Sequence, residues 1–243
     1  MLKELLGLYE AGRINPGTPE CLFPETEIFN EGWLLRLVLK AWLAGSGPSR
    51  FDFLPFPQGV AAYSEGQLYT PFGAGPLYER NTHVDSIVGD FSITDTKSGI
   101  VLNPQLRYVA AIEAKIFGRI SRGVKSAPDY DQVSRTAACL INSVLRARPQ
   151  TTYSAHLALV YAEDNPYIDR AEYGRDYIQR TIADRLEPFT ATEERSHTIE
   201  RFAEGWKEVF ERLKVHFLTW EDVVADLGDD KLSAFYESCK KFA

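Results

Sequence analysis

The chain of 243 residues has few of the side chains that build disulfides or structural zinc sites. Its three cysteines and four histidines are scattered along the sequence. The odd number and wide spacing of Cys21, Cys139 and Cys239 are typical of reduced thiols in the cytosol. No HExxH or CxxC spacing occurs, so the sequence predicts no zinc site.

Long apolar runs are also missing. No run reaches the roughly 18 residues that a membrane-spanning helix needs. The segment 1–13, MLKELLGLYEAGR, lacks the apolar stretch and the cleavage site of a signal peptide, and it predicts a short amphipathic helix. We therefore expect a cytoplasmic protein with no membrane partner.

The net charge of −7 argues against a broad cationic coat for nucleic acid. It still allows a local basic groove, because nearby charges set the field at a cleft. It is equally compatible with an acidic site that gathers a divalent metal. The 44% of hydrophobic and 25% of charged residues are ordinary for a globular protein.

Hydrophobic periodicity predicts a mixed sheet flanked by helices, an α/β fold in one domain over residues 1–243. The helices are predicted at 24–44, 129–147, 166–186, 193–213, 221–227 and 229–241, and the strands at 83–94, 106–116, 152–162 and 214–220. Segment 48–82 is rich in proline, glycine and aromatic residues. It predicts irregular chain with one short strand near 67–72.

One carboxylate interrupts the core face of the first predicted helix. The 3-4-3-4 stripe contains Ile28, Glu31, Leu35, Val38 and Trp42. An ionised carboxylate on such a face is costly unless it is paired or binds a metal. Glu31 therefore either forms an ion pair, with Arg36 or Lys115, or serves a metal site.

The stretch AIEAKIFGRISRGVK, 111–125, begins as a buried strand and ends in charges. Residues two apart share a face of a strand, so Glu113 and Lys115 point the same way. Pairing with the preceding strand places Asp85 on that face and Asp90 on the other. A slip of one residue would exchange the two aspartates. An ordinary ion pair between Asp85 and Lys115 is the alternative interpretation.

Two close carboxylates raise each other's pKa, and a divalent cation relieves that conflict. Mg²⁺ takes oxygen ligands, usually one or two carboxylates with water and phosphate. A lysine beside the metal can orient or deprotonate a water, or neutralise charge on a phosphorane. This combination is suited to metal-assisted phosphodiester hydrolysis.

Asp85 followed by Glu113-Ala114-Lys115 resembles the motif of the PD-(D/E)XK nuclease superfamily, with Val84 in place of the motif's proline. The upstream helix with Glu31 and the downstream segment YDQVSR, 130–135, also resemble that superfamily. The resemblance covers about 25–162, with 214–227 as a late core element, and implies a restriction-endonuclease-like fold.

The resemblance implies roles for these residues. Asp85, Glu113, the carbonyl of Ala114 and Glu31 would hold Mg²⁺ or Mn²⁺, and Lys115 would be the catalytic lysine. These carboxylates, the lysine and Gln132 would form the catalytic set.

Two further groups of residues are candidates for contact with substrate. Gln132 and Arg135 lie one helical turn apart and would orient water or grip a phosphate; a solvated helix face is the alternative. The basic residues Arg119, Arg122 and Lys125 would meet a passing phosphate backbone, unless they are ordinary surface charges.

The expected function is a metal-dependent nuclease acting on DNA. A catalytically inactive module that binds nucleic acid or protein is the alternative, and a homodimer is compatible with either.

Overall fold

The computed structural model describes residues 25–45, 49–74, 77–94, 99–123, 127–170, 172–191 and 196–243. Its centre is a five-stranded sheet in the order β1-β2-β5-β6-β7. These strands are β1 (Ala61–Leu68), β2 (Thr82–Gly89), β5 (Tyr108–Lys115), β6 (Ser154–Tyr161) and β7 (Leu213–Thr219). β1, β2 and β5 pair antiparallel, whereas β5, β6 and β7 pair parallel. The predicted mixed α/β sheet is therefore confirmed.

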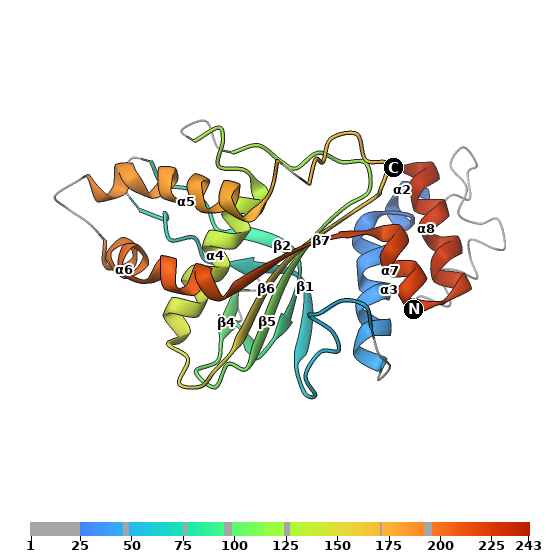
Figure 1. Ribbon diagram of the computed structural model, residues 1–243, viewed down its shortest axis with the longest axis horizontal. Helices are drawn as coiled ribbons and strands as arrows, with labels where there is room; N and C mark the ends of the chain where they lie inside the picture. Colours follow the sequence, from blue (N-terminus) through green and yellow to red (C-terminus); the bar gives the residue numbers. More distant parts are fainter. Residues whose placement is uncertain are drawn as a thin grey trace.

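Helices cover both faces of this sheet (Figure 1). One face carries α4 (Gln132–Ala147), α5 (Arg175–Thr190) and α6 (His197–Arg212), and the other carries α2 (Glu25–Ile28), α3 (Glu31–Ala44), α7 (Trp220–Leu227) and α8 (Asp230–Phe242). Two separate apolar clusters result, one on each side of the sheet. No helix in these described ranges combines the length and the apolar character of a bilayer span.

The predicted helix 24–44 is divided into α2 and α3. Asn30 causes the division, because its side chain accepts a hydrogen bond from Trp33 N (3.0 Å) and caps the start of α3. The helix ends at Ala44, as predicted, with Gly45 as its C-cap. Glu31 thus lies in the first turn of α3, at the end of the helix nearest the cap.

The strand predicted within segment 48–82 was wrong in its position and length. β1 begins at Ala61 and runs for eight residues to Leu68, whereas the sequence predicted a short strand at 67–72. The strand lacks an alternating apolar pattern because β1 is an edge strand with one half-exposed face. The aromatic residues nearby pack into the core: Phe51 and Phe53 are buried against Trp42.

The predicted strands 83–94 and 106–116 pair antiparallel, but the first of them is broken and a further short strand precedes the second. β2 ends at Gly89, and the short strands β3 (Phe91–Ile93) and β4 (Ile100–Leu102) form a separate two-stranded ribbon. Gly89 has φ +156°, and a Cβ there would lie 2.5 Å from the carbonyl oxygen of Tyr108. The break therefore depends on a residue without a side chain.

The remaining elements follow the predictions closely, apart from α5. α4 and the turn before it bury one apolar face, made of Tyr130, Val133, Ala137, Leu140, Ile141 and Val144. The α5 helix begins at Arg175, well inside the predicted range 166–186, and extends to Thr190. β6, β7, α6, α7 and α8 lie within a few residues of their predicted ranges.

Candidate active site

The candidate site lies where β2 and β5 part. Their ladder runs from Gly89↔Val109 to Ser86↔Ile112. The next residue in each strand is Asp85 in β2 and Glu113 in β5. Asp85 Oδ2 accepts a hydrogen bond from Ala114 N at 2.7 Å, so a carboxylate takes the place of the next strand partner. The predicted parity is confirmed, because Asp85, Glu113 and Lys115 share one face.

The same register shows which of Asp85 and Asp90 lies beside Glu113. Asp90 lies beyond Gly89 at the far end of β2, where its Oδ1 receives a 2.7 Å bond from Arg107. Burial would raise the pKa of Asp90, but the bonds from Arg107 outweigh burial and lower that pKa. Asp85 is therefore the aspartate beside Glu113.

Lys115 lies between two carboxylates from different elements. Its Nζ is 3.5 Å from Asp85 Oδ2 and 3.6 Å from Glu31 Oε1. Burial alone would lower the pKa of Lys115, but Asp85, Glu31 and Glu113 reverse the effect and raise it. The ammonium is therefore the favoured form.

The partner of Glu31 is Lys115 and not Arg36. The other oxygen of Glu31 accepts a bond from Ile116 N at 2.9 Å, so this carboxylate joins α3 to the end of β5. Burial raises the pKa of Glu31, and Lys115 and the Ile116 N–H partly offset that rise. The ion-pair interpretation of Glu31 is thus realised in the structure; a role in holding metal stays a prediction.

Glu113 is the most enclosed acid of the group, with 1% of its surface exposed. Its oxygens accept bonds from Gln132 Nε2 (2.7 Å) and Thr136 Oγ1 (2.6 Å), both on α4. Burial and then the neighbouring Asp85 raise the pKa of Glu113 well above its ordinary value. Gln132 therefore contacts a carboxylate of the site directly, and its predicted contact with water or phosphate is not tested by this geometry.

Thr136 was missed by the sequence analysis. It is fully buried and lies four residues after Gln132, on the same face of α4. A hydroxyl at that spacing from Gln132 was the available signal, because residues four apart are neighbours on a helix.

Two more side chains that the sequence did not indicate hold the backbone after Glu113. Trp220 Nε1 donates to the carbonyl of Lys115 at 3.0 Å, and Asn165 Nδ2 donates to the carbonyl of Ile116 at 2.7 Å. Both are buried. Asn165 lies 49 residues and Trp220 lies 105 residues along the chain from its partner. No local pattern in the sequence could therefore reveal them.

The predicted phosphate-contacting residues are only partly brought together. Arg119 and Arg122 are exposed, and the Arg119 guanidinium lies 4.2 Å from the centre of the Tyr167 ring. Their loop is tied to the start of α4 by a 2.9 Å bond from Gln132 N to Ser121 O. Lys125 lies outside the described residues.

Arg135 belongs to a different environment. It is half-buried, and its charge opposes the rise that burial causes in the pKa of Glu79. Its buried Nε has no hydrogen-bond partner among the described residues. Arg135 therefore faces the buried acid Glu79, and its predicted contact with nucleic acid remains a prediction.

The fit of a divalent metal rests on two carboxylates. Within the described ranges, no three Asp, Glu, His or Cys side chains are grouped so that they could hold an ion. Glu31 faces Lys115 and Ile116, which leaves Asp85 and Glu113 as the pair. The C=O of Ala114 points to the same side of β5 as its N–H, toward Asp85. Two carboxylates and one carbonyl are suitable ligands for Mg²⁺ or Mn²⁺.

Comparison with known proteins adds no assignment: no family model matches the chain, and neither a curated protein nor a solved structure matches it.

Proposed function

We propose that the protein is a metal-dependent phosphodiester hydrolase of the PD-(D/E)XK type, with the restriction-endonuclease-like fold and DNA as its substrate. One observation carries the proposal. Three elements bring Glu31, Asp85, Glu113 and Lys115 to the point where β2 and β5 separate, with the lysine 3.5 Å and 3.6 Å from two of the acids. An ordinary ion pair at the surface would explain neither the presence of a third acid nor the burial of Glu113.

In this proposal, Asp85, Glu113 and the carbonyl of Ala114 hold Mg²⁺ or Mn²⁺. When bound, the cation polarises the scissile phosphate and lowers the pKa of a coordinated water. The raised pKa of Glu113 is consistent with this arrangement, because a cation favours the ionised form of both acids.

The other residues bind and orient. Lys115 supplies a positive charge and N–H donors to the phosphate oxygens, which gain negative charge in the transition state. Glu31 holds Lys115 in place from α3. Gln132 holds the Glu113 carboxylate, and the exposed Arg119 and Arg122 meet the phosphate backbone that follows the scissile bond.

The test is a cleavage assay. Purified protein is incubated with Mg²⁺ or Mn²⁺ and with single-stranded DNA, duplex DNA and RNA, beside the Lys115→Ala variant. We expect cleavage of DNA by the native protein and a loss of roughly 100-fold or more in the variant, the scale of losing one charge-stabilising donor.

Lys207→Ala is the matched control, because Lys207 is exposed on α6, on the opposite side of the sheet from α3. It should cleave like the native protein. Circular dichroism checks that all three proteins are folded. Cleavage that survives Lys115→Ala unchanged contradicts the assignment.

A binding module without turnover is the second candidate, and one observation favours it. Each acid of the site already has a partner within the protein: Glu31 and Asp85 pair with Lys115, and Glu113 accepts two bonds from α4. Calorimetry with Mn²⁺ separates the candidates. The nuclease binds Mn²⁺ and loses that binding in Asp85→Asn, whereas the inactive module shows no such loss.

A further inference from the structure

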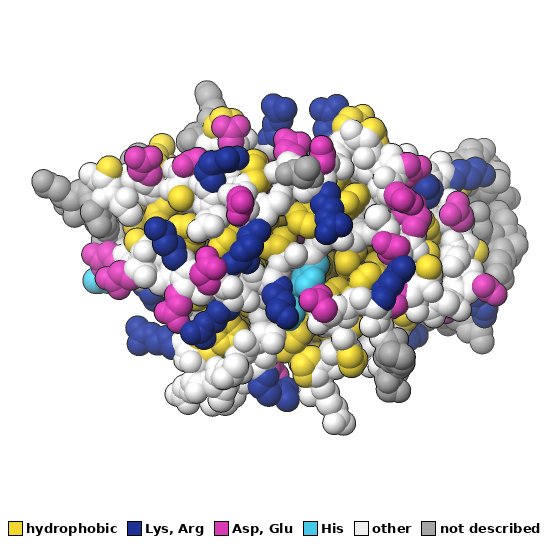
Figure 2. Space-filling model, viewed as in Figure 1, with side chains coloured by type: hydrophobic (Ala, Val, Ile, Leu, Met, Phe, Trp, Pro, Cys, Tyr) yellow, Lys and Arg dark blue, Asp and Glu magenta, His cyan; other side chains and the backbone are white. Residues whose placement is uncertain are grey.

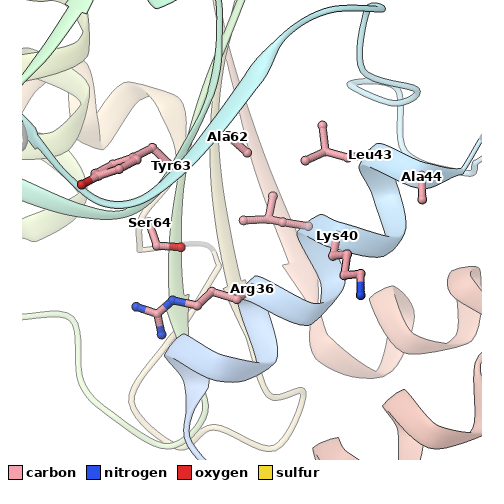
Figure 3. Close-up of a pocket in the computed structure, with 8 residues that line it drawn as sticks. Arg36, Lys40, Leu43, Ala44, Ala62, Tyr63 and Ser64 are labelled. Atoms are coloured by element: carbon pink, nitrogen blue, oxygen red, sulfur yellow. The ribbon is translucent and has the colours of Figure 1, made fainter. Parts of the chain in front are cut away.

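A groove of about 470 Å³ lies between α3 and the edge strand β1. Figure 3 shows Leu43 and Lys40 on the helix side, and Ala62 and Ser64 on the strand side. Arg36 extends from the helix toward Ser64. The candidate active site does not include any of these side chains.

The groove is aliphatic inside and cationic at its border. Leu39, Leu43 and Ala62 give it apolar walls, and Arg36 and Lys40 give it two positive charges one helical turn apart. None of the described residues that line it is acidic. This local sign is opposite to the net charge of −7, and the face of the molecule in Figure 2 carries both signs interspersed.

Arg36 marks the end of the groove that is nearer to the candidate active site along α3. Arg36 lies five residues after Glu31 on α3. On the strand side, Ser64 pairs with Ser86, the neighbour of Asp85 in β2. The groove therefore lies along α3 on the β1 side, with its Arg36 end toward the site, whereas the loop with Arg119 and Arg122 follows β5.

We propose that this groove holds one single strand of nucleic acid next to the scissile phosphate, with its phosphates on Arg36 and Lys40. The proposal rests on the proposed nuclease function. The two cations complement a phosphate backbone, as in positively charged grooves that follow single strands, and the aliphatic walls pack against its sugars. Arg36, Lys40 and Ser64 contact the backbone only, so binding is independent of sequence. A substrate with a single-stranded tail is the expected form.

The experiment measures binding of a labelled single-stranded oligonucleotide by fluorescence anisotropy over a range of salt concentrations, with EDTA present so that no cleavage occurs. The double variant Arg36→Ala/Lys40→Ala is compared with native protein. Each lost phosphate contact removes about 0.7 from the slope of log affinity against log salt for a single strand. We expect the slope to fall by about 1.4 in the double variant.

Lys207→Ala/Lys231→Ala is the control. It removes two exposed cations from α6 and α8, away from the groove, and should keep the native slope. A blunt duplex is the second substrate. The groove variant should lose the native preference for a tailed over a blunt duplex, and the control should retain it.

The possible outcomes distinguish a failure of the groove proposal from a failure of the proposed nuclease function. Equal slopes for the groove variant and the control, with native cleavage intact, overturn the groove and leave the nuclease standing. An equal loss on blunt duplex and single strand overturns the choice of a single strand. A native protein that neither binds nor cleaves nucleic acid overturns the proposed function itself.

A second copy of the chain is the rival occupant of the groove. Leu43 is 43% exposed, and Leu43→Glu would place a charge in the apolar wall. If light scattering shows a native dimer that Leu43→Glu dissociates while oligonucleotide binding is unchanged, the groove is a contact between copies and the proposal is wrong.

Discussion

At the scale of single residues, the site shows how the protein tolerates buried acids. Glu113 is enclosed and lies beside Asp85, yet it accepts two short hydrogen bonds from α4. Glu31 interrupts a core stripe, and its cost is offset by a backbone N–H and by Lys115. Each acid is satisfied by an element other than its own, so the group is stable only when those elements are packed.

Thr136→Val should destabilise the protein by about 1–3 kcal/mol, the scale of leaving a buried acceptor without its donor. The substitution preserves the shape but removes the hydroxyl that donates to Glu113 at 2.6 Å. It also removes a contact that lowers the pKa of Glu113. Urea unfolding measures the loss.

Thr136→Ser is the matched control, because it keeps the hydroxyl and removes one methyl group. Its loss should be about 0.8 kcal/mol, the value of a buried methylene. Equal losses in the two variants would show that the hydroxyl contributes nothing.

At the scale of elements, the break between β2 and β3 decides which acids meet. Because the ladder of β2 and β5 stops at Gly89↔Val109 at one end and Ser86↔Ile112 at the other, Asp85 and Asp90 lie just outside opposite ends. Asp90 turns to Arg107 instead. Proline and glycine content alone does not show where such a break falls.

Gly89→Ala should destabilise the protein by more than about 2 kcal/mol. The added Cβ would lie 2.5 Å from Tyr108 O, and φ +156° is a conformation that alanine rarely adopts. Thermal or urea unfolding gives the value.

Gly59→Ala separates the two causes. Gly59 has φ +82°, but an added Cβ there meets no atom within 4 Å. Its loss should therefore be only about 1–2 kcal/mol, the cost of the backbone conformation. If Gly89→Ala loses no more than Gly59→Ala, the close approach of Tyr108 does not matter.

At the scale of the whole molecule, a histidine pair on the sheet contacts the irregular segment that contains Asp52 and Phe53. His156 Nδ1 and His216 Nε2, on β6 and β7, are 2.9 Å apart. His216 Nδ1 is 3.2 Å from Asp52, and the ring of Phe53 packs on both imidazoles. Tyr108 stacks on His156 from β5.

This arrangement predicts a loss of stability in acid. Burial, then the charges of His216 and Lys214, lower the pKa of His156 to about 4, and Asp52 opposes them. At His156, the unfolded chain therefore binds up to one more proton than the folded protein between pH 6.5 and about 4. The contribution of His156 is complete above pH 6.5 and falls by at most about 1.4 kcal/mol per pH unit below it.

The variant His156→Phe should flatten this dependence of stability on pH. The free energy of unfolding is measured at about pH 7, 6, 5 and 4. His197→Phe changes an exposed histidine on α6 and should keep the native slope. A native slope in His156→Phe would show that other groups cause the acid loss.

The sequence by itself determined the elements whose signal is local. The core face of α4, the strand β6 and the shared face of Asp85, Glu113 and Lys115 follow from periods of 3.6 and 2.0 residues. These periods are properties of neighbouring residues, so they need no knowledge of the partner element.

Only the tertiary structure decided what those faces contact. It selected Lys115 as the partner of Glu31, supplied Thr136, Trp220 and Asn165, and placed β1 beside α3 to form the groove. These contacts depend on how helices and strands that are far apart in the sequence pack together. Such packing produces no periodic pattern in a single sequence.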